Sequence, residues 1–329
     1  MTDTLDDEVG PAEAAAGDVP APGGDTTGEA SYEVVLVTYH SRDHVTGLLA
    51  TLGDGVPVAL VDNSSGADDV AGLFADRPAS RCLDGGNVGF ARAANRGART
   101  STADYLVFVN PDARPTRAVL ETLVADLAAD PGLGSVAAAT VSEQQHIELG
   151  VGGWEPTPIR CLAYASGWHL VRPRSGVYAQ PAVGEDIELG WITGACLAVR
   201  RETFLRLGGF DERYFVYNED MAFGRAIREA GLRQRLRTDL LVPHATSSSS
   251  GPAVAGGGLP KMPQQKGASM ASYLVDHNGP IAATTMRALL MAGFLPRLAV
   301  AVARRDSTAR RHHLAYLKGQ WTRRSPYRP

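Results

Sequence analysis

Val34-Val35-Leu36-Val37-Thr38-Tyr39 is a short apolar run, rich in β-branched residues, that predicts a buried strand at the start of the ordered chain. Similar runs follow it, and stretches of helical pattern separate them. We expect strands at residues 56–61 and 104–109, and helices at 43–52, 68–74, 88–100 and 116–129. Strands that alternate with helices imply right-handed crossovers and a mostly parallel sheet with helices on both faces. The sequence therefore predicts an α/β fold.

The pattern changes after Val141. Residues 142–189 are rich in Gly, Pro and aromatic residues, and regular elements resume at 191–199, 201–207 and 219–230. Residues 247–258 are almost entirely Ser, Gly, Ala and Pro, which is typical of a flexible loop. We divide the chain into a tail at 1–31, a domain at 32–245 with halves at 32–141 and 142–245, a flexible loop at 246–268, and a helical C-terminal extension at 269–329.

The net charge of −4 hides an asymmetry between the two ends of the chain. Residues 1–30 carry eight acids and no Lys or Arg, with few apolar residues to offset the entropy of ordering, so we expect disorder there. Residues 287–329 carry ten bases and one acid. A basic stretch with apolar side chains can lie on an anionic membrane surface, whereas the alternative is a helical extension packed on the domain or a homodimer contact.

The apolar stretch at 281–303 is interrupted by Arg287, Pro296 and Arg297, which argues against a spanning helix. The three cysteines are few and widely spaced, so they fit buried thiols in a reducing cytoplasm better than a disulfide framework. We therefore expect a cytoplasmic protein, peripheral on the inner face of the cell membrane if the basic extension binds lipid. Nothing in the sequence indicates nucleic-acid binding.

Two polar phrases follow predicted strands. Asp62-Asn63-Ser64 ends the second strand, and in open α/β sheets ligands bind beyond the carboxyl ends of the strands. A carboxylate there accepts the imide hydrogen of a uracil or thymine base, or simply caps a turn. Asn110-Pro111-Asp112 ends the strand at 104–109, where a carboxylate is either a natural ligand for Mg²⁺ or Mn²⁺ near a diphosphate or part of an ordinary turn.

Three further phrases add to this set. Residues 86–91 (Gly-Asn-Val-Gly-Phe-Ala) open a helix, and their glycines let the backbone approach an anion at the helix N-terminus. His244 follows an apolar run and is either a metal ligand or a hydrogen-bonded strand-end histidine. Glu219-Asp220 begins a helix, so these carboxylates are either catalytic or ordinary helix N-terminal charge.

Taken together and in order, these phrases resemble the family 2 glycosyltransferases, which have the GT-A fold, a Rossmann-like fold of nucleotide-diphospho-sugar transferases. The closest likeness is to bacterial rhamnosyltransferases of cell-wall and polysaccharide assembly. The resemblance covers residues 33–244. It implies a nucleotide-sugar-binding half at 32–141 and an acceptor-binding half at 142–245.

The resemblance also assigns roles to residues. Asp220 matches the general base, but the last acid of the family's usual Glu-Asp-x-Asp pattern is absent here, which leaves Glu219 as the other candidate. Asp112 and His244 would hold Mg²⁺ or Mn²⁺, and Trp191, Thr193 and Gly194 would face the acceptor. Apart from the resemblance, we expect the flexible loop to close over the donor and bring Lys261 or Lys266 to the diphosphate. The donor would be bound by Thr38, Tyr39, His40, Asp62, Asn63, Asn87, Gly89, Phe90, Asn95, Asn110 and Asp112.

The activity that the resemblance implies is inverting, metal-dependent transfer of a sugar, as in the hexosyltransferases. We expect L-rhamnose to move from dTDP-rhamnose to a hydroxyl of a saccharide or a polyprenyl-diphosphate-linked saccharide. The alternatives are a galactofuranosyl- or other hexosyltransferase that uses a UDP-sugar, and a non-catalytic nucleotide-sugar-binding protein.

Overall fold

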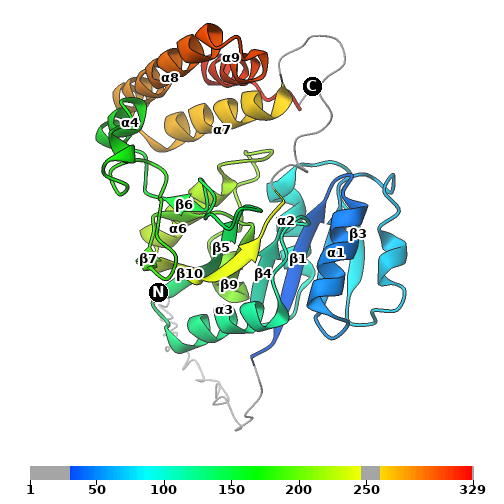
Figure 1. The fold of residues 1–329 in the computed structure, drawn as a ribbon. Coiled ribbons are helices and arrows are strands. Elements are labelled where there is room, and N and C mark those ends of the chain that lie inside the picture. Colours follow the sequence, from blue (N-terminus) through cyan, green and yellow to red (C-terminus); the bar gives the residue numbers. More distant parts are fainter. Residues whose placement is uncertain (1–29, 246–259, 328–329) are drawn as a thin grey trace, which may run out of the picture.

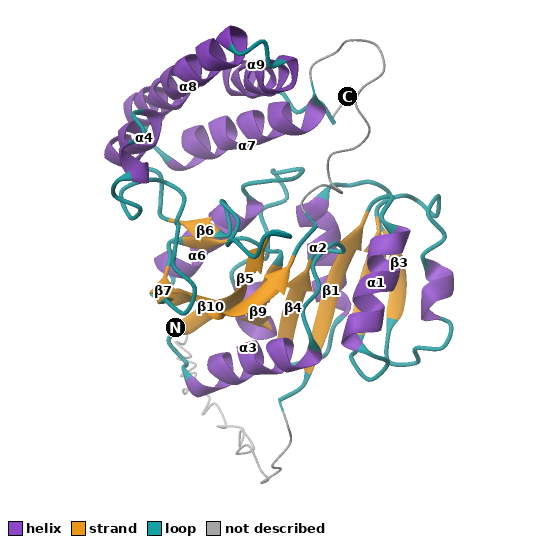
Figure 2. Cartoon of the chain, in the orientation of Figure 1, coloured by secondary structure: helices purple, strands orange, loops and turns teal. Residues whose placement is uncertain are grey.

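The structure is a computed structural model that describes residues 30–245 and 260–327. The predicted acidic tail lies almost wholly outside the described residues, as do residues 247–258 of the predicted loop. An eight-stranded sheet forms the centre, with strand order β3-β2-β1-β4-β9-β5-β10-β7. Figures 1 and 2 show this sheet between two groups of helices, and a layer of helices beyond one of its edges.

The strands and helices alternate over the first half of the chain. The strands of the large sheet are β1 (Tyr32–Thr38), β2 (Val58–Asp62), β3 (Arg81–Asp84), β4 (Tyr105–Val109), β5 (Leu133–Val141), β7 (Asp186–Glu188), β9 (Cys196–Arg200) and β10 (Arg233–Pro243), and β6 (Gly152–Gly153) pairs with β8 (Trp191–Ile192) in a small second sheet. The helices are α1 (Arg42–Leu52), α2 (Phe90–Thr100), α3 (Arg117–Ala129), α4 (Pro158–Ala165), α5 (Arg201–Arg206), α6 (Glu219–Glu229), α7 (Lys261–His277), α8 (Pro280–Ala303) and α9 (Ser307–Thr322), with 3₁₀ turns η1 (Ala71–Phe74) and η2 (Trp168–Leu170).

The sheet is mostly parallel. Strands β3, β2, β1 and β4 pair in parallel, and so do β5 and β10. Strand β9 is antiparallel to both β4 and β5, so those two share a direction, and β7 is antiparallel to β10. Six strands therefore end at one edge of the sheet, which is where open α/β sheets bind ligands.

Alternation of side chains along β1 explains the layers. Val34 and Leu36 belong to a core with α1 and α3, whereas Val35 belongs to a second core with α2, α5 and α6. Because successive side chains of a strand point to opposite faces, one apolar strand fills both cores. This pattern confirms the predicted parallel sheet with helices on both faces.

Three expectations about elements are wrong. Residues 68–74 form only the 3₁₀ turn η1, which begins at Ala71 and not at Asp68. Residues 191–199 divide into β8 and β9. Residues 261–268 of the predicted loop are helical, because α7 begins at Lys261.

Helix α8 runs through Pro296 without ending. Among the described helices it is the one that is long and apolar enough to cross a membrane, by length and composition alone.

Candidate functional site

The predicted donor residues lie at the edge of the sheet where the six parallel strands end. Thr38 is the last residue of β1 and pairs in register with Asp62 at the end of β2. Asn110 follows β4, and His244 follows β10 and bridges to Ala113. The structure thus brings together phrases that are more than two hundred residues apart in the sequence.

Asp112, His244 and Glu148 form a buried cluster. The Nε2 atom of His244 lies 3.1 Å from Oδ1 of Asp112, and its Nδ1 atom lies 2.8 Å from Oε2 of Glu148. Burial alone would lower the pKa of His244, but the hydrogen bonds and charges of the two carboxylates raise it to about 9. The imidazole is therefore fixed at both nitrogens, with one of them facing the predicted metal carboxylate.

Glu148 was not predicted, because the sequence between β5 and β6 has no regular pattern. A carboxylate on the far nitrogen of a histidine is the usual support of a metal-binding imidazole, since it fixes the orientation of the ring. No group of three acidic, His or Cys side chains with metal-site geometry occurs in residues 30–245 and 260–327. A cation bound at this cluster would therefore have Asp112 and His244 as two ligands from the described part of the chain.

Asp62 and its neighbours form the second part of the site. The Asp62 carboxylate is buried and accepts hydrogen bonds from the backbone N–H groups of Ser64 and Gly66, at 2.7 and 2.9 Å. It therefore caps its own turn. Two buried side-chain oxygens nearby, Oγ1 of Thr38 and Oδ1 of Asn63, have no hydrogen-bond partner among the described residues. Buried polar atoms of this kind are rare and call for an explanation, such as a ligand.

The other two residues of the first loop, Tyr39 and His40, are exposed beyond the end of β1. Their rings meet at 4.4 Å between centroids, and His40 has a left-handed φ of 51°. The loop therefore turns sharply away from the sheet and leaves the Tyr39 ring open to solvent.

The loop before α2 is held by the chain that precedes α6. Gly89 has a φ of 91°, and a Cβ atom there would lie 2.4 Å from the carbonyl oxygen of Phe215. The backbone N–H of Phe90 donates to that oxygen at 2.7 Å. Glycine is required at this position by both conformation and space. Asn87 is exposed, so it is free to meet a ligand at the start of the helix.

Asn95 does not face the donor side, and the prediction of a donor contact there is wrong. Its side chain is buried, accepts a hydrogen bond from the backbone N–H of Phe210, and donates to the carbonyl oxygen of Phe210 and to Glu212. All of its polar atoms are engaged inside the protein. Asn95 instead joins α2 to the segment that leads to Glu219-Asp220.

Glu219 and Asp220 differ in environment. Tyr217 and Asn218, immediately before them, adopt left-handed φ angles of 68° and 70°, and this turn starts α6. Glu219 is buried, and its Oε2 atom has no partner among the described residues. Burial first, and then the charge of Asp220, raise the pKa of Glu219 well above its ordinary value. Burial and the neighbouring charge thus favour the protonated form of Glu219.

Asp220 is the less buried of the two. Its Oδ1 atom accepts a hydrogen bond from the backbone N–H of Met221 at 2.8 Å. Burial raises the pKa of Asp220 to about 6, against the opposing effect of backbone N–H groups at the start of α6. The carboxylate is thus ionised at neutral pH and more basic than an ordinary aspartate, which are the properties of a general base.

Tyr217 links the two sets of carboxylates. Burial raises its pKa, and the charges of Glu219, Asp112 and Asp220 raise it further, so both sides of the site lie within its electrostatic reach. The ammonium group of Lys266 lies 4.9 Å from the centre of the Tyr217 ring and interacts electrostatically with Glu148. Neither Tyr217 nor the helical position of Lys266 was predicted, since each depends on the docking of α7.

The predicted acceptor segment is partly in the core. Trp191 is buried with Tyr178 and Met221 in a third apolar core, so its ring has no open face. Gly194 is buried beside Phe90 and Phe210. Thr193 is half-buried, and its N–H donates to the carbonyl oxygen of Val151. Of these three residues, Thr193 alone retains an accessible side chain.

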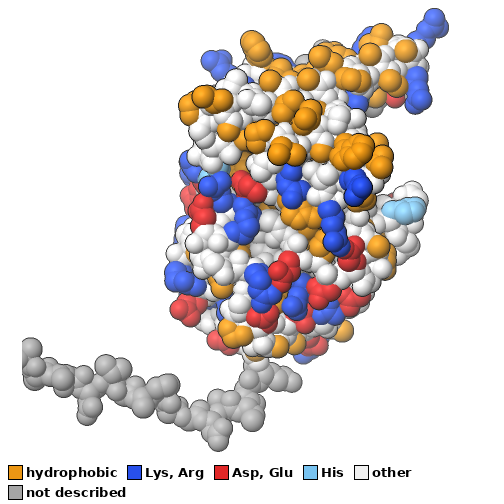
Figure 3. All heavy atoms as spheres, turned by 90° about the vertical axis from the view of Figure 1, so that its left-hand side faces the viewer, with side chains coloured by type: hydrophobic (Ala, Val, Ile, Leu, Met, Phe, Trp, Pro, Cys, Tyr) orange, Lys and Arg blue, Asp and Glu red, His pale blue; other side chains and the backbone are white. Residues whose placement is uncertain are grey.

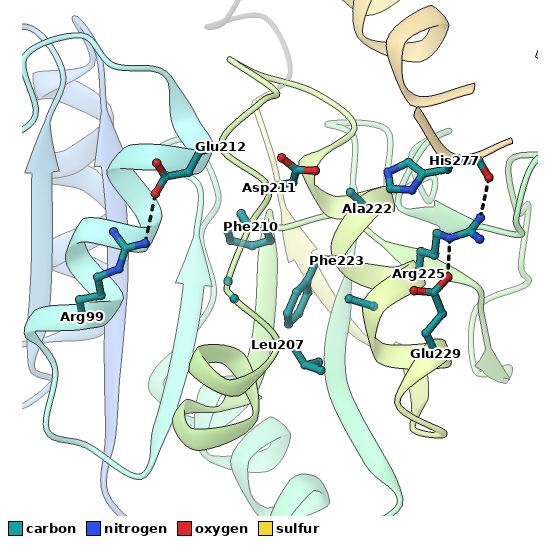
Figure 4. A pocket seen from close by; sticks show the side chains of 13 residues that line it. Arg99, Leu207, Phe210, Asp211, Glu212, Ala222, Phe223, Arg225, Glu229 and His277 are labelled. Carbon is teal, nitrogen blue, oxygen red and sulfur yellow. Dashed lines mark hydrogen bonds and ion pairs between the residues drawn. The ribbon is translucent and has the colours of Figure 1, made fainter. Parts of the chain in front are cut away.

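A separate cavity of about 460 Å³ lies between α2, α6 and the segment 207–212, and contains none of the predicted catalytic or metal residues. Figure 4 shows its charged walls. Arg99 pairs with Glu212, and Arg225 pairs with Glu229 and with the backbone of His277. The charged side chains drawn here are thus paired with other protein groups, and the cavity is distinct from the cluster of Asp112, Glu148 and His244.

Comparison with known proteins gives a family for this fold and site. Residues 33–153 match the model of glycosyl transferase family 2. The chain is 29% identical over 222 residues to the N-acetylglucosaminyl-diphospho-decaprenol L-rhamnosyltransferase of Mycobacterium tuberculosis, covering 60% of this chain and 70% of that protein. It is also 29% identical over 225 residues to the pre-mycofactocin glycosyltransferase of the same organism, covering 65% of this chain and 43% of that protein.

A solved mannosyltransferase of Pyrobaculum calidifontis, in complex with GDP-mannose and Mn²⁺, has the same fold, with a TM-score of 0.53 at 18% identity over 90% of this chain and 88% of that one. The fold and these matches define a glycosyltransferase with the GT-A architecture. Within that class the chain resembles the family 2 glycosyltransferases and, among them, the rhamnosyltransferases.

Proposed function

We propose that this enzyme is an inverting, metal-dependent rhamnosyltransferase. It transfers L-rhamnose from dTDP-rhamnose to a hydroxyl of a saccharide, carried on a polyprenyl diphosphate at the cytoplasmic face of the membrane. The named activity of the mycobacterial relative supports both the sugar and the lipid-linked acceptor. The observation that carries the proposal is that Asp112 and Asp220 both interact electrostatically with Tyr217, and that His244 contacts Asp112 at the carboxyl edge of the sheet.

The nucleotide occupies the ends of β1 and β2. Each oxygen of the Asp62 carboxylate accepts one backbone N–H and keeps a second lone pair, so the carboxylate can still accept the imide hydrogen of a pyrimidine base. The unpartnered hydroxyl of Thr38 can donate a hydrogen bond to a base carbonyl, and the unpartnered amide oxygen of Asn63 can accept one from a sugar hydroxyl. These groups suit a thymine or uracil nucleotide.

Asp112 and His244 would hold a divalent cation. Their facing oxygen and nitrogen atoms suit Mn²⁺ or Mg²⁺, and Glu148 supplies the carboxylate that orients the imidazole. Two protein ligands leave most of the coordination to water and to diphosphate oxygens, so tight binding requires the nucleotide. When bound, such an ion offsets the charge that develops on the leaving diphosphate.

Asp220 acts as the base. It accepts the proton of the acceptor hydroxyl as that oxygen forms a bond to the anomeric carbon, and the bond to the diphosphate breaks on the opposite face, so the configuration inverts. Lys266, beside Tyr217 and Glu148, adds positive charge near the leaving group. Glu219 is less suited to the role because it is buried, and burial raises its pKa and favours the protonated form.

A donor panel tests the proposal. The purified protein would be mixed with dTDP-rhamnose, UDP-galactofuranose, UDP-glucose and GDP-mannose, each with Mn²⁺, Mg²⁺ or EDTA, and hydrolysis of labelled donor would be followed. We expect dTDP-rhamnose to be hydrolysed slowly and only with metal. Preference for a UDP-sugar would identify another hexosyltransferase, and binding without hydrolysis or transfer would contradict the enzymatic proposal.

A further inference from the structure

The outward face of α8 carries no charge. Every exposed residue from 281 to 303 is uncharged, and the larger ones recur at helical spacing, as in Ile281, Leu295 and Val302. The two arginines of the helix turn inward. Arg287 donates to the carbonyl oxygen of Gln320, and Arg297 donates to that of Gly293 and lies over the Tyr164 ring. A 24-residue helix spans about 36 Å, so this uncharged surface is long.

The segment from α4 to η2 extends this surface. Five large apolar side chains within thirteen residues are mostly solvent-exposed: Ile159 at 79%, Leu162 at 53%, Trp168 at 54%, Leu170 at 70% and Val171 at 70%. Helix α4 packs directly on α8, where a Cβ atom on Gly293 would lie 2.6 Å from Cα of Ala165. The two helices therefore form one apolar surface, which we call the α4–α8 face. A soluble monomer rarely exposes a contiguous apolar surface of this kind without a partner.

The segments that build this face are basic. Residues 156–175 contain three arginines and no acid, and residues 280–327 contain nine bases and one acid, Asp306. Figure 3 shows hydrophobic side chains gathered over the helical layer, whereas acidic and basic side chains mix over the sheet domain. Arg172 directly follows the exposed Val171, and Arg304 and Arg305 are exposed at the end of α8. Apolar side chains bordered by arginines match the interface of an anionic bilayer.

We infer that the α4–α8 face docks on an anionic lipid bilayer, with α8 parallel to the membrane plane and the side chains of α4 and η2 inserted beside it. This inference deepens the proposed function. The link between membrane docking and a lipid-linked acceptor rests on that function. Helix α8 does not cross the bilayer, because Met286, Leu290 and Phe294 are buried within the helical layer. A helix that crossed the membrane would lose this packing. A second copy of the chain is the poorer occupant, because docking two such faces would bring together the arginines that border them, Arg172, Arg304 and Arg305.

Vesicle binding by the full-length protein tests the inference. We expect it to pellet at low salt with vesicles of phosphatidylcholine and phosphatidylglycerol in equal amounts, and much less with phosphatidylcholine alone. The variant Ile159→Ser/Leu170→Ser/Val171→Ser should partition at least about tenfold more weakly. Arg304→Gln/Arg305→Gln should weaken binding to anionic vesicles by about fivefold for each arginine. Val183→Ser is the matched control, because Val183 is 59% exposed in the loop before β7.

Other outcomes separate the competing explanations. If the triple variant kept its thermal midpoint and bound vesicles as well as the parent protein, the α4–α8 face would not be the surface that binds lipid. Resistance of vesicle-bound protein to extraction by high salt and alkaline carbonate would indicate a spanning α8. A concentration-dependent dimer that fails to bind vesicles, and that the triple variant abolishes, would assign the face to a second copy. Donor hydrolysis without vesicles reports separately on the proposed function, so each can fail alone.

Discussion

Adjacent carboxylates differ in chemistry here because one points into the protein and the other stays near its surface. Glu219 is buried with an unpartnered oxygen, whereas Asp220 is partly exposed and has a pKa raised to about 6. We expect Asp220→Asn to lower turnover by at least about 10²-fold with little change in donor affinity. Glu219→Gln should retain turnover within about tenfold. Steady-state kinetics and donor titration of both variants measure this, and the reverse ranking would make Glu219 the base.

The pKa of Asp220 also predicts two opposite pH effects. The rate constant kcat/KM should fall as pH drops below about 6, because the protonated carboxyl cannot accept a proton. Stability should change the other way. The folded pKa is above that of the unfolded chain, which is about 3.9, so ionisation costs folding free energy as pH rises from about 4 to 6.

Asp220→Asn should therefore stabilise the protein by about 3 kcal/mol at pH 7.5 and have little effect at pH 4. Thermal or denaturant unfolding of the two proteins at both pH values makes the comparison. A variant that is equally or less stable than the parent at pH 7.5 would show that burial does not strain this carboxylate.

At the scale of elements, Asn95 connects α2 to the segment that positions α6. Its side chain makes three hydrogen bonds to Phe210 and Glu212. Asn95→Ala leaves buried backbone groups unpaired, so we expect a loss of about 2 kcal/mol in stability and a fall in kcat larger than any rise in donor KM. Asn278→Ala, which removes a hydrogen bond within its own helix end, is the control. A normal kcat in Asn95→Ala would mean that the segment needs no such support.

The same elements show what the sequence can and cannot predict. The positions of Asp62, Asp112 and His244 at strand ends were predictable, because apolar runs mark the strands and parallel strands end together. Asn95 was wrongly predicted to contact the donor. A polar residue in a helix can face either a ligand or a neighbouring segment of the chain, and the sequence does not distinguish the two. Helix α4 was overlooked even though Thr157 and Pro158 are a helix-start signal, because the surrounding residues have no regular pattern.

Glu148, Tyr217 and Lys266 could not be predicted for a different reason. They meet only because α7 packs across the start of α6, and no local pattern encodes a contact between distant segments. The sequence predicted a basic C-terminal extension attached through a flexible loop. The structure instead joins α7 to the catalytic domain through the third core, where Met270 and Tyr273 pack with Met221.

At the scale of the whole molecule, Glu155 connects the helical layer to the catalytic domain. Its carboxylate accepts hydrogen bonds from the Tyr273 hydroxyl of α7, at 2.8 and 3.0 Å, and pairs with Arg225 and Arg228 of α6. The layer should therefore unfold together with the sheet domain, in one transition. Truncating the chain before α8 would expose the apolar partners of Met286 and Leu290, so point variants are the better probe.

We expect Glu155→Gln to destabilise the whole protein by about 2 kcal/mol, because it removes the charge that two partly buried arginines face. Tyr273→Phe, which removes one donor, should cost about 1 kcal/mol. Glu121→Gln is the control, since Glu121 pairs with Arg117 on an exposed helix face, where such pairs contribute below about 1 kcal/mol. Calorimetry should show a single transition that moves as a unit in both Glu155→Gln and Tyr273→Phe. Two separate transitions, with only the lower one shifted, would mean that the helical layer is an independent unit and that its contact with Tyr217 is not fixed in solution.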